Sequence, residues 1–91
     1  MSDASPSLRE LKSRAQLTAV SIRLGKAGAS PEFITAFNET LDRLQLVKVR
    51  FEDLKDERKA LSKQLAEQTG SQLVQQVGHT AVFFRKRSPE A

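Results

Sequence analysis

The sequence contains no cysteine, no tryptophan and no tyrosine, and it has a single histidine. Without cysteine the protein can form neither a disulfide nor a thiolate nucleophile, and most zinc sites are excluded as well. No apolar run approaches the roughly 20 residues that a membrane-spanning helix needs. Residues 1–6 are polar and include Asp3, so they resemble neither a signal peptide nor a transit peptide. These absences predict a cytoplasmic protein without a membrane segment, a metal or a cofactor.

The residues that most enzymes use for catalysis are scarce and scattered. His79 follows a glycine in an expected turn, and no serine forms a recognisable motif with it. The acidic pairs Glu52-Asp53 and Asp56-Glu57 lie between a strand and a helix, where helix capping explains them better than acid–base catalysis. We therefore expect a protein that is not an enzyme.

Charge is distributed unevenly along the chain, although the net charge is only +4. Residues 4–30 carry five bases against one acid, residues 31–57 four bases against seven acids, and residues 58–91 six bases against two acids. Two basic segments that flank an acidic one suit a polyanion such as nucleic acid, because phosphate contacts dominate that kind of binding. A solvated surface is the alternative interpretation of the charge alone.

The beginning of the chain predicts a helix and then a strand. Apolar residues spaced by three and four predict a helix over about residues 7–16, and residues 19–24 alternate with the period of a half-buried strand. The expected buried positions of the two elements are Leu8, Leu11, Ala15, Val20, Ile22 and Leu24.

Two further helices are expected over about residues 31–45 and 53–69. Ser30 can cap the first of them, and Pro31 tolerates its first position. Asp53 or Asp56 can cap the second, and the pair Thr69-Gly70 can end it with a left-handed residue. Their expected core positions are Ile34, Phe37, Leu41 and Leu44 in the first helix, and Leu54, Ala60, Leu61 and Leu65 in the second.

Three more strands complete the pattern. Residues 47–51 alternate, with Lys48 and Arg50 pointing away from the core, and residues 72–77 and 80–86 form a hairpin whose Gly78-His79 turn suits type II′. Phe83 and Phe84 point to opposite faces, and such residues are more often core than base-stacking. The order α-β-α-β-α-β-β predicts an α/β fold (α+β by another convention) with a four-stranded mixed sheet. Its first two strands should be parallel, with a right-handed crossover.

A glycine loop, Gly25-Lys26-Ala27-Gly28, joins the first strand to the helix after it. Two glycines let the backbone approach a ligand closely, Lys26 adds a cation, and helix amides can face a phosphate oxygen. The spacing fits neither a P-loop nor a dinucleotide-binding loop, whereas KH domains clamp a nucleotide backbone with a comparable loop. A plain turn is the alternative, and the basic surroundings favour binding.

Other basic residues gather around this loop by strand parity and chain order. Arg23 shares a sheet face with Lys48 and Arg50 if the first two strands are neighbours. We interpret the cations of the third helix as part of a solvated face, with an RNA-binding face as the second interpretation. The expected RNA-binding set is Gly25, Lys26, Ala27, Gly28, Arg23, Lys48, Arg50, Arg85, Lys86, Arg87, Lys12 and Arg14.

Three segments carry a family resemblance: residues 23–28 (RLGKAG), 46–51 (LVKVRF) and 74–86 (VQQVGHTAVFFRK). Together they resemble the CRM domain (chloroplast RNA splicing and ribosome maturation), in particular its bacterial stand-alone YhbY-type members. The resemblance implies a fold similar to the C-terminal domain of translation initiation factor three, and RNA binding through the loop 25–28. It also implies association with large ribosomal subunit precursors, with their ribosomal RNA and ribosomal proteins as partners.

We thus expect one RNA-binding domain over residues 7–87, with flexible tails at 1–6 and 88–91, acting as a monomer in ribosome assembly. The alternative is a protein-interaction module that docks on a ribosomal protein or assembly factor through the acidic helix 31–44. Salt separates the two, because only RNA binding should weaken steeply as ionic strength rises. The surface of the alternative would be formed by Glu32, Glu39, Asp42 and Arg43.

Overall fold

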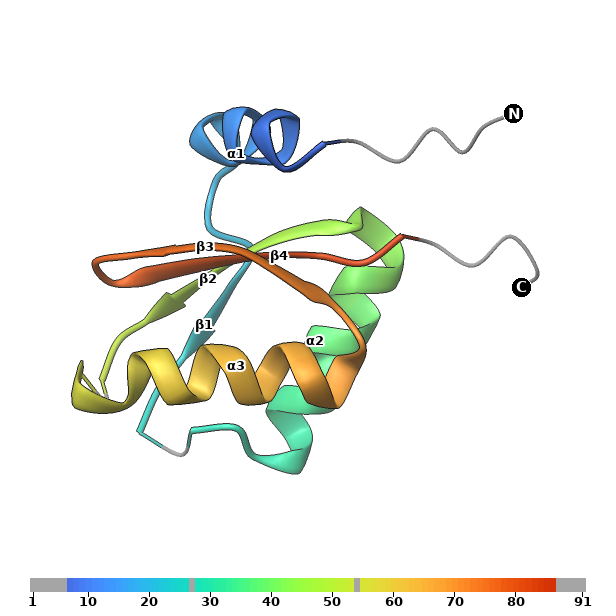
Figure 1. The fold of residues 1–91 in the computed structure, drawn as a ribbon. Helices are drawn as coiled ribbons and strands as arrows, with labels where there is room; N and C mark the ends of the chain where they lie inside the picture. Colours follow the sequence, from blue (N-terminus) through green and yellow to red (C-terminus); the bar gives the residue numbers. More distant parts are fainter. Residues whose placement is uncertain (1–6, 27, 54, 87–91) are drawn as a thin grey trace.

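The computed structural model describes residues 7–26, 28–53 and 55–86. One helix covers one face of a four-stranded sheet and two helices cover the other (Figure 1). This is the predicted order and fold class. The expected tails, residues 1–6 and 88–91, lie outside the described residues. The elements are α1 (Leu8–Leu17), β1 (Ile22–Leu24), α2 (Pro31–Leu44), β2 (Leu46–Phe51), the 3₁₀ helix η1 (Lys55–Glu57), α3 (Arg58–Thr69), β3 (Gln72–Val77) and β4 (Thr80–Phe84).

The strands lie in the order β1-β2-β4-β3, with β1 parallel to β2 and the other pairs antiparallel. At one end of the sheet, the Glu52 amide donates to the Leu24 carbonyl at 2.9 Å and the Phe51 amide donates to the His79 carbonyl at 2.7 Å. The ends of β1 and β2 and the β3–β4 turn therefore lie together. We call this the loop end of the sheet.

The larger core lies between the sheet and the pair α2 and α3. Phe37 of α2 packs edge-to-face on Phe83 of β4, with ring centroids 5.0 Å apart. The inward valines and phenylalanine of β2 join them, as their alternation predicts. The fully buried members of this core are Leu24, Phe37, Leu41, Val47, Val49, Phe51, Leu65, Ala81 and Phe83.

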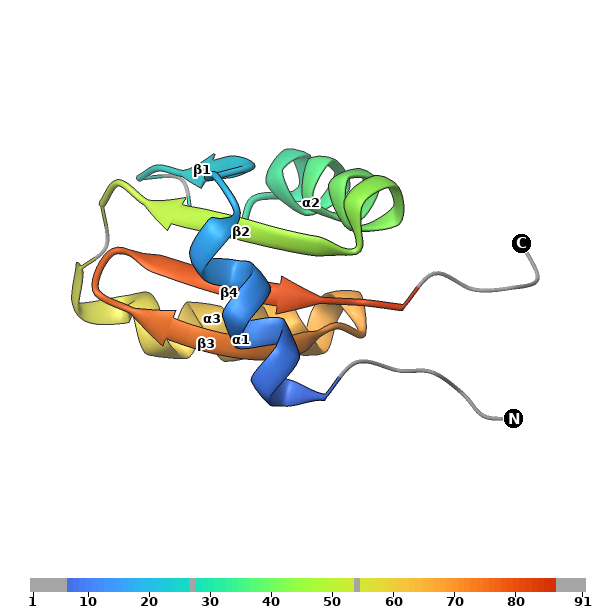
Figure 2. The same ribbon diagram turned by 90° about the horizontal axis from the view of Figure 1, so that it is seen from above.

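The smaller core lies under α1, which crosses the other face of the sheet (Figure 2). Leu11 and Ala15 of α1 pack there against Val74, Val82 and Phe84. Phe83 and Phe84 do point to opposite faces, and both are buried because each face has its own helix layer. Neither ring is therefore open for stacking on a base.

The capping predictions for the start of α2 and the end of α3 are confirmed, and the one for the start of α3 is wrong. The Ser30 hydroxyl accepts from the Phe33 amide at 3.2 Å at the start of α2, and Gly70 ends α3 in the left-handed conformation. The prediction that Asp53 or Asp56 caps α3 is wrong. The chain enters α3 through η1, and the capping position is held by Glu57, whose side chain makes no capping bond.

Some expected core positions lie at the surface. Val20 is outside β1 and 37% exposed, because pairing with β2 begins only at Ser21. Leu8 and Leu44 are about half exposed in the end turns of their helices, beyond the packed layers. Ala60 is exposed because the buried stripe of α3 instead contains Ser62, Leu65 and Thr69. Leu54 lies outside the described residues.

Candidate nucleic-acid interface

The glycine loop forms a tight turn between β1 and α2. The Gly28 amide donates to the Gly25 carbonyl at 3.0 Å, and the Ser30 amide donates to the Gly28 carbonyl at 2.8 Å. Gly28 has φ 67°, a left-handed value that strains residues with a side chain. Lys26 is exposed in the turn, and Ala27 lies outside the described residues.

Gly25 lacks the left-handed backbone conformation that favours glycine at position 28. Its φ is outside the left-handed region, and among the described residues, its two chain neighbours apart, no heavy atom lies within 4 Å of the position that a Cβ would take. Neither its backbone conformation nor its packing inside the molecule therefore requires glycine. The residue is exposed, so the missing side chain leaves its backbone open to a ligand from outside.

The start of α2 offers fewer amides to a ligand than the sequence suggested. Pro31 has no amide hydrogen, the Phe33 amide bonds the Ser30 hydroxyl, and the Ile34 amide bonds the Ser30 carbonyl. Glu32 retains an amide in the first turn, but it also brings a carboxylate to the same place. The helix dipole can thus add only a small part to anion binding there.

Arg23 and Arg50 are direct partners across the parallel pair β1 and β2. Both side chains are exposed and point to the face of the sheet that carries α1, as strand parity predicts. The Arg23 Nε lies 3.5 Å from a carboxylate oxygen of Glu52, and both of these side chains are largely in solvent. Together with Lys26, the two arginines place three cations at the loop end.

Lys48 lies on the same face but has a role inside the fold. Its Nζ donates to the Thr18 carbonyl at 3.3 Å and to the Ala15 carbonyl at 3.5 Å. A cation there stabilises the carbonyl end of α1, whose dipole is negative. We therefore leave Lys48 out of the surface that could contact RNA.

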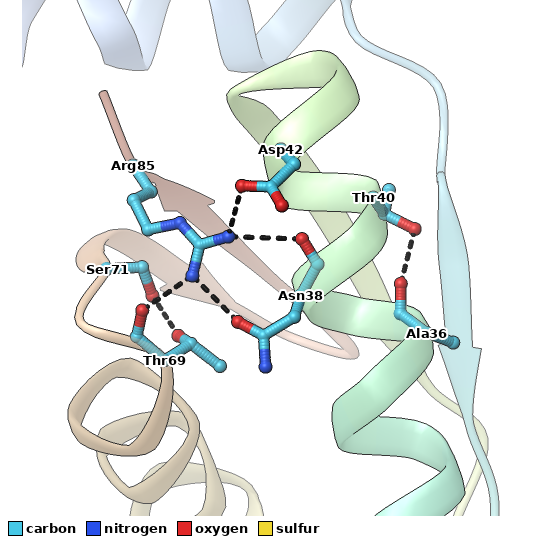
Figure 3. A network of polar contacts seen from close by, with 7 residues as sticks. All are labelled: Ala36, Asn38, Thr40, Asp42, Thr69, Ser71 and Arg85. Atoms are coloured by element: carbon cyan, nitrogen blue, oxygen red, sulfur yellow. Dashed lines mark hydrogen bonds and ion pairs between the residues drawn. The ribbon is translucent and has the colours of Figure 1, made fainter. Parts of the chain in front are cut away.

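Arg85 is likewise held inside the fold, at the opposite end of the sheet (Figure 3). Its guanidinium donates to the Asn38 side chain at 2.7 Å, the Thr69 carbonyl at 2.8 Å and a carboxylate oxygen of Asp42 at 2.8 Å. The side chain is only 22% exposed. Arg85 thus joins the end of β4 to both α2 and α3, and these bonds occupy both of its Nη atoms.

The remaining predicted cations lie on other elements or outside the described residues. Lys86 is exposed beyond the end of β4, and Arg87 lies outside the described residues. The end of β4 pairs with the start of β2, so the strand rise from Thr80 to Phe84 puts it about 14 Å from the loop end. Lys12 and Arg14 are exposed on α1. Of the predicted residues that the structure describes, Arg23, Gly25, Lys26, Gly28 and Arg50 therefore lie together at the loop end.

One contact at the loop end was missed from the sequence. The guanidinium of Arg58, at the start of α3, donates to the Gly78 carbonyl at 2.8 Å and lies 2.8 Å from His79 Nδ1. A guanidinium can only donate, so His79 Nδ1 is the acceptor of this hydrogen bond. The contact holds the hairpin turn against α3. It joins residues 20 and 21 apart, a separation for which local sequence carries no signal.

The surface at the loop end is open. No pocket is found among residues 7–26, 28–53 and 55–86. In the same part of the chain, no helix has the length and apolar character to cross a membrane. Ligands at this end must accordingly be bound on the outside, as backbone phosphates can be.

Comparisons with known proteins agree with this geometry. The family model of the CRS1 / YhbY (CRM) domain matches residues 5–85. The solution structure of the hypothetical protein SAV1595 from Staphylococcus aureus, described provisionally as an RNA-binding protein, is similar with a TM-score of 0.77 and 32% sequence identity. The similarity covers 89% of this chain and 85% of that one. No curated protein sequence matches significantly.

Proposed function

The chain belongs to the CRM domain family, a family of RNA-binding domains rather than of enzymes, and from this premise we propose that it binds RNA backbone at the loop end. The main-chain groups of the glycine loop approach the phosphates, and Lys26 neutralises them. Arg23 and Arg50 extend the contact onto the sheet. Lys12 and Arg14 on α1 and Lys86 beyond β4 add a more distant positive field.

The observation that carries the proposal is the open position at Gly25. Glycine is disfavoured where nothing requires it, because it costs conformational entropy on folding. At Gly25 neither φ nor a neighbour among the described residues requires it. Close approach of an external ligand to the backbone would explain why this position is glycine. A nucleotide backbone suits such a ligand because Arg23, Lys26 and Arg50 lie nearby.

Carboxylates at the same end limit how RNA can lie. Glu32 stands at the start of α2, and Glu52 follows β2. The two arginines lie on the face of the sheet that carries α1, so RNA that leaves the loop on this side avoids Glu32. Three cation contacts predict a log–log salt slope of about −2 for a single strand.

The cellular role that best suits this chain is assembly of the large ribosomal subunit. The resemblance to the bacterial stand-alone members of the family supports that role, with precursor ribosomal RNA as the ligand. Binding through phosphates and a glycine loop gives little sequence readout. We therefore expect the RNA to be selected by its shape and its accessible single-stranded regions.

The test is binding to a large-subunit ribosomal RNA precursor over a salt series. We expect Gly25→Ala to lower affinity about tenfold without a change in stability, since its methyl group meets only the ligand. Lys26→Glu should lower affinity and make the salt slope shallower.

Gly70→Ala is the matched control. Gly70 also has open space around it, but it has φ 64° and ends α3 at the opposite end of the sheet. This variant should lose about 1 kcal/mol of stability and keep its RNA affinity. Unchanged affinity and slope in both Gly25→Ala and Lys26→Glu would remove the loop from the mechanism.

The alternative, docking of a protein partner on α2, is weaker in the structure than in the sequence. Asp42, one of its four expected contact residues, bonds Arg85 within the fold. Glu32 and Glu39 remain exposed. Binding that hardly changes with salt would favour this alternative.

A further inference from the structure

A single row of side chains crosses the whole sheet at its loop end. Arg23 of β1 is opposite Arg50 of β2, Arg50 is opposite Thr80 of β4, and Thr80 is opposite Val77 of β3. Residues directly opposite each other point to the same face, which here is the face that carries α1. At about 4.8 Å between strands, the row spans about 14 Å. We call these four residues the open row.

The open row is a part of this face that α1 leaves uncovered. Figure 2 shows α1 across the middle of the sheet, away from the β3–β4 turn. The next row on this face contains Lys48 and Val82; Lys48 holds the end of α1, and Val82 is 1% exposed beneath it. In the open row, by contrast, Arg23 and Arg50 are exposed and Val77 is 62% exposed.

The cationic half of the row is unfavourable for the folded protein alone. Like charges directly opposite each other on neighbouring strands repel. Glu52 lies near Arg23, but Arg50 has no ion-pair partner within the part of the chain that the structure describes. An anion between the two guanidiniums would remove this repulsion. A phosphate also suits the fork of an arginine side chain.

The other half of the row is uncharged. The Thr80 hydroxyl donates to the Val77 carbonyl at 3.1 Å, which leaves its methyl group and the isopropyl group of Val77 as an apolar surface. Such a surface beside a phosphate site matches the order of groups in a nucleotide, from phosphate through ribose to base. A peptide of acidic residues would match only the arginines.

We propose that the open row carries a single-stranded RNA segment that continues from the glycine loop. Its phosphate lies between Arg23 and Arg50, and its ribose or base lies on Thr80 and Val77. The chain leads from Arg23 directly into Gly25, so the two contacts are continuous. This inference rests on the proposed RNA-binding function and adds to it a preference for unpaired nucleotides.

The preference for unpaired nucleotides follows from the groups of the RNA that each half of the open row can contact. A duplex presents its phosphates to the arginines, but its bases are stacked and paired. Only an unpaired strand can turn a base or ribose onto Val77. Loss of the apolar surface should therefore weaken single-strand binding and leave duplex binding unchanged.

The test measures binding of a short fluorescein-labelled oligouridine and of the same strand annealed to oligoadenosine. Arg50→Gln should weaken both by about fivefold to tenfold and make the salt slope shallower by about 0.7 for the single strand. Val77→Ser should weaken only the single strand, by about twofold to fivefold.

Two control variants match these changes in chemistry but not in position. Leu44→Ser changes a side chain that is 48% exposed at the end of α2, and Lys63→Gln changes an exposed cation on α3. Both should bind both RNAs like the unchanged protein. Urea unfolding of all four variants checks that their stability is retained.

The outcomes separate this inference from the function on which it rests. Loss of binding in Gly25→Ala, with normal binding in Arg50→Gln and Val77→Ser, would overturn the open row and leave the loop in place. Loss in the row variants alone would support the row and overturn the loop. If Val77→Ser weakened single strand and duplex equally, the proposed contact with an unpaired nucleotide would be wrong.

Discussion

The guanidinium of Arg85 donates a hydrogen bond of 2.8 Å to the carboxylate of Asp42, a residue 43 positions earlier in the chain. The same side chain reaches Asn38 of α2 and the last carbonyl of α3 (Figure 3). One arginine thus satisfies polar groups from two helices at the end of β4. At the other end of the sheet, the exposed Arg50 faces another arginine. The two residues should respond to mutation in opposite ways.

Replacement of Arg85 should affect folding rather than RNA binding. Arg85→Ala leaves the Thr69 carbonyl and the Asn38 side chain without their donor, which should lower the free energy of unfolding by about 2–3 kcal/mol. Urea unfolding gives that value, and RNA titration of the folded variant should give an unchanged dissociation constant. Arg50→Ala should show the reverse, with weaker RNA binding and no loss of stability, since it removes the repulsion with Arg23. Equal effects of the two changes on stability would contradict this division.

Replacement of Lys48 should loosen α1. Lys48→Met keeps the apolar stem but removes the bonds to the Ala15 and Thr18 carbonyls, so stability should fall by about 1 kcal/mol. Hydrogen exchange of the α1 amides should rise more than that of β2 and β4, because the lost contact belongs to α1. Uniform exchange changes over the whole chain would count against this role of Lys48.

Replacement of Ser62 should stabilise the protein. This side chain is fully buried, and its hydroxyl has no hydrogen-bond partner among the described residues. Ser62→Ala removes an unsatisfied polar group and raises helix propensity, so the free energy of unfolding should rise by about 1 kcal/mol. Ser13→Ala, at an exposed position of α1, is the control and should give about half of that gain. A loss of stability in Ser62→Ala would show that the hydroxyl has a partner.

Replacement of Gln45 by glycine should also stabilise the protein. Gln45 has φ 65° and ψ −45° at the end of α2, a conformation that strains a residue with a side chain. Gln45→Gly should therefore raise the free energy of unfolding by about 0.5–1 kcal/mol, after the entropy of the unfolded glycine is counted. Gln64→Gly, at an exposed position within α3, should lower it by about 1 kcal/mol. Thermal unfolding of both variants distinguishes local strain from a general effect of glycine.

Several features of the fold could be predicted because their causes are local. The alternation in residues 47–51 fixed which side chains of β2 are buried, and it put Arg50 on the same face as Arg23. Ser30 and Pro31 marked the start of α2 through their own hydrogen-bonding and backbone preferences. The Gly78-His79 pair predicted the hairpin turn. Of these two residues only Gly78 has a positive φ, which fits the predicted type II′ turn.

The sequence carries least information where a distant element decides the environment of a residue. Arg85 looks like part of a basic run in the sequence, yet its partners lie 16, 43 and 47 positions away. Lys48 alternates outward from β2, but α1 packs over it and supplies carbonyls 30 and 33 positions away. Local sequence carries no signal for such contacts. The prediction therefore placed both cations on the surface from their charge alone.

The sequence by itself determined the elements, their order, the glycine loop and the family, because propensity, alternation and turn chemistry act over a few residues. Only the tertiary structure decided which cations are free to meet RNA. That decision depends on where α1 crosses the sheet and where α2 and α3 end. A buried carbonyl must find a donor wherever the folded chain provides one, and here Lys48 and Arg85 are those donors. Arg23 and Arg50 are exposed at the loop end because α1 does not extend over them, and Lys26 is exposed in the turn after β1.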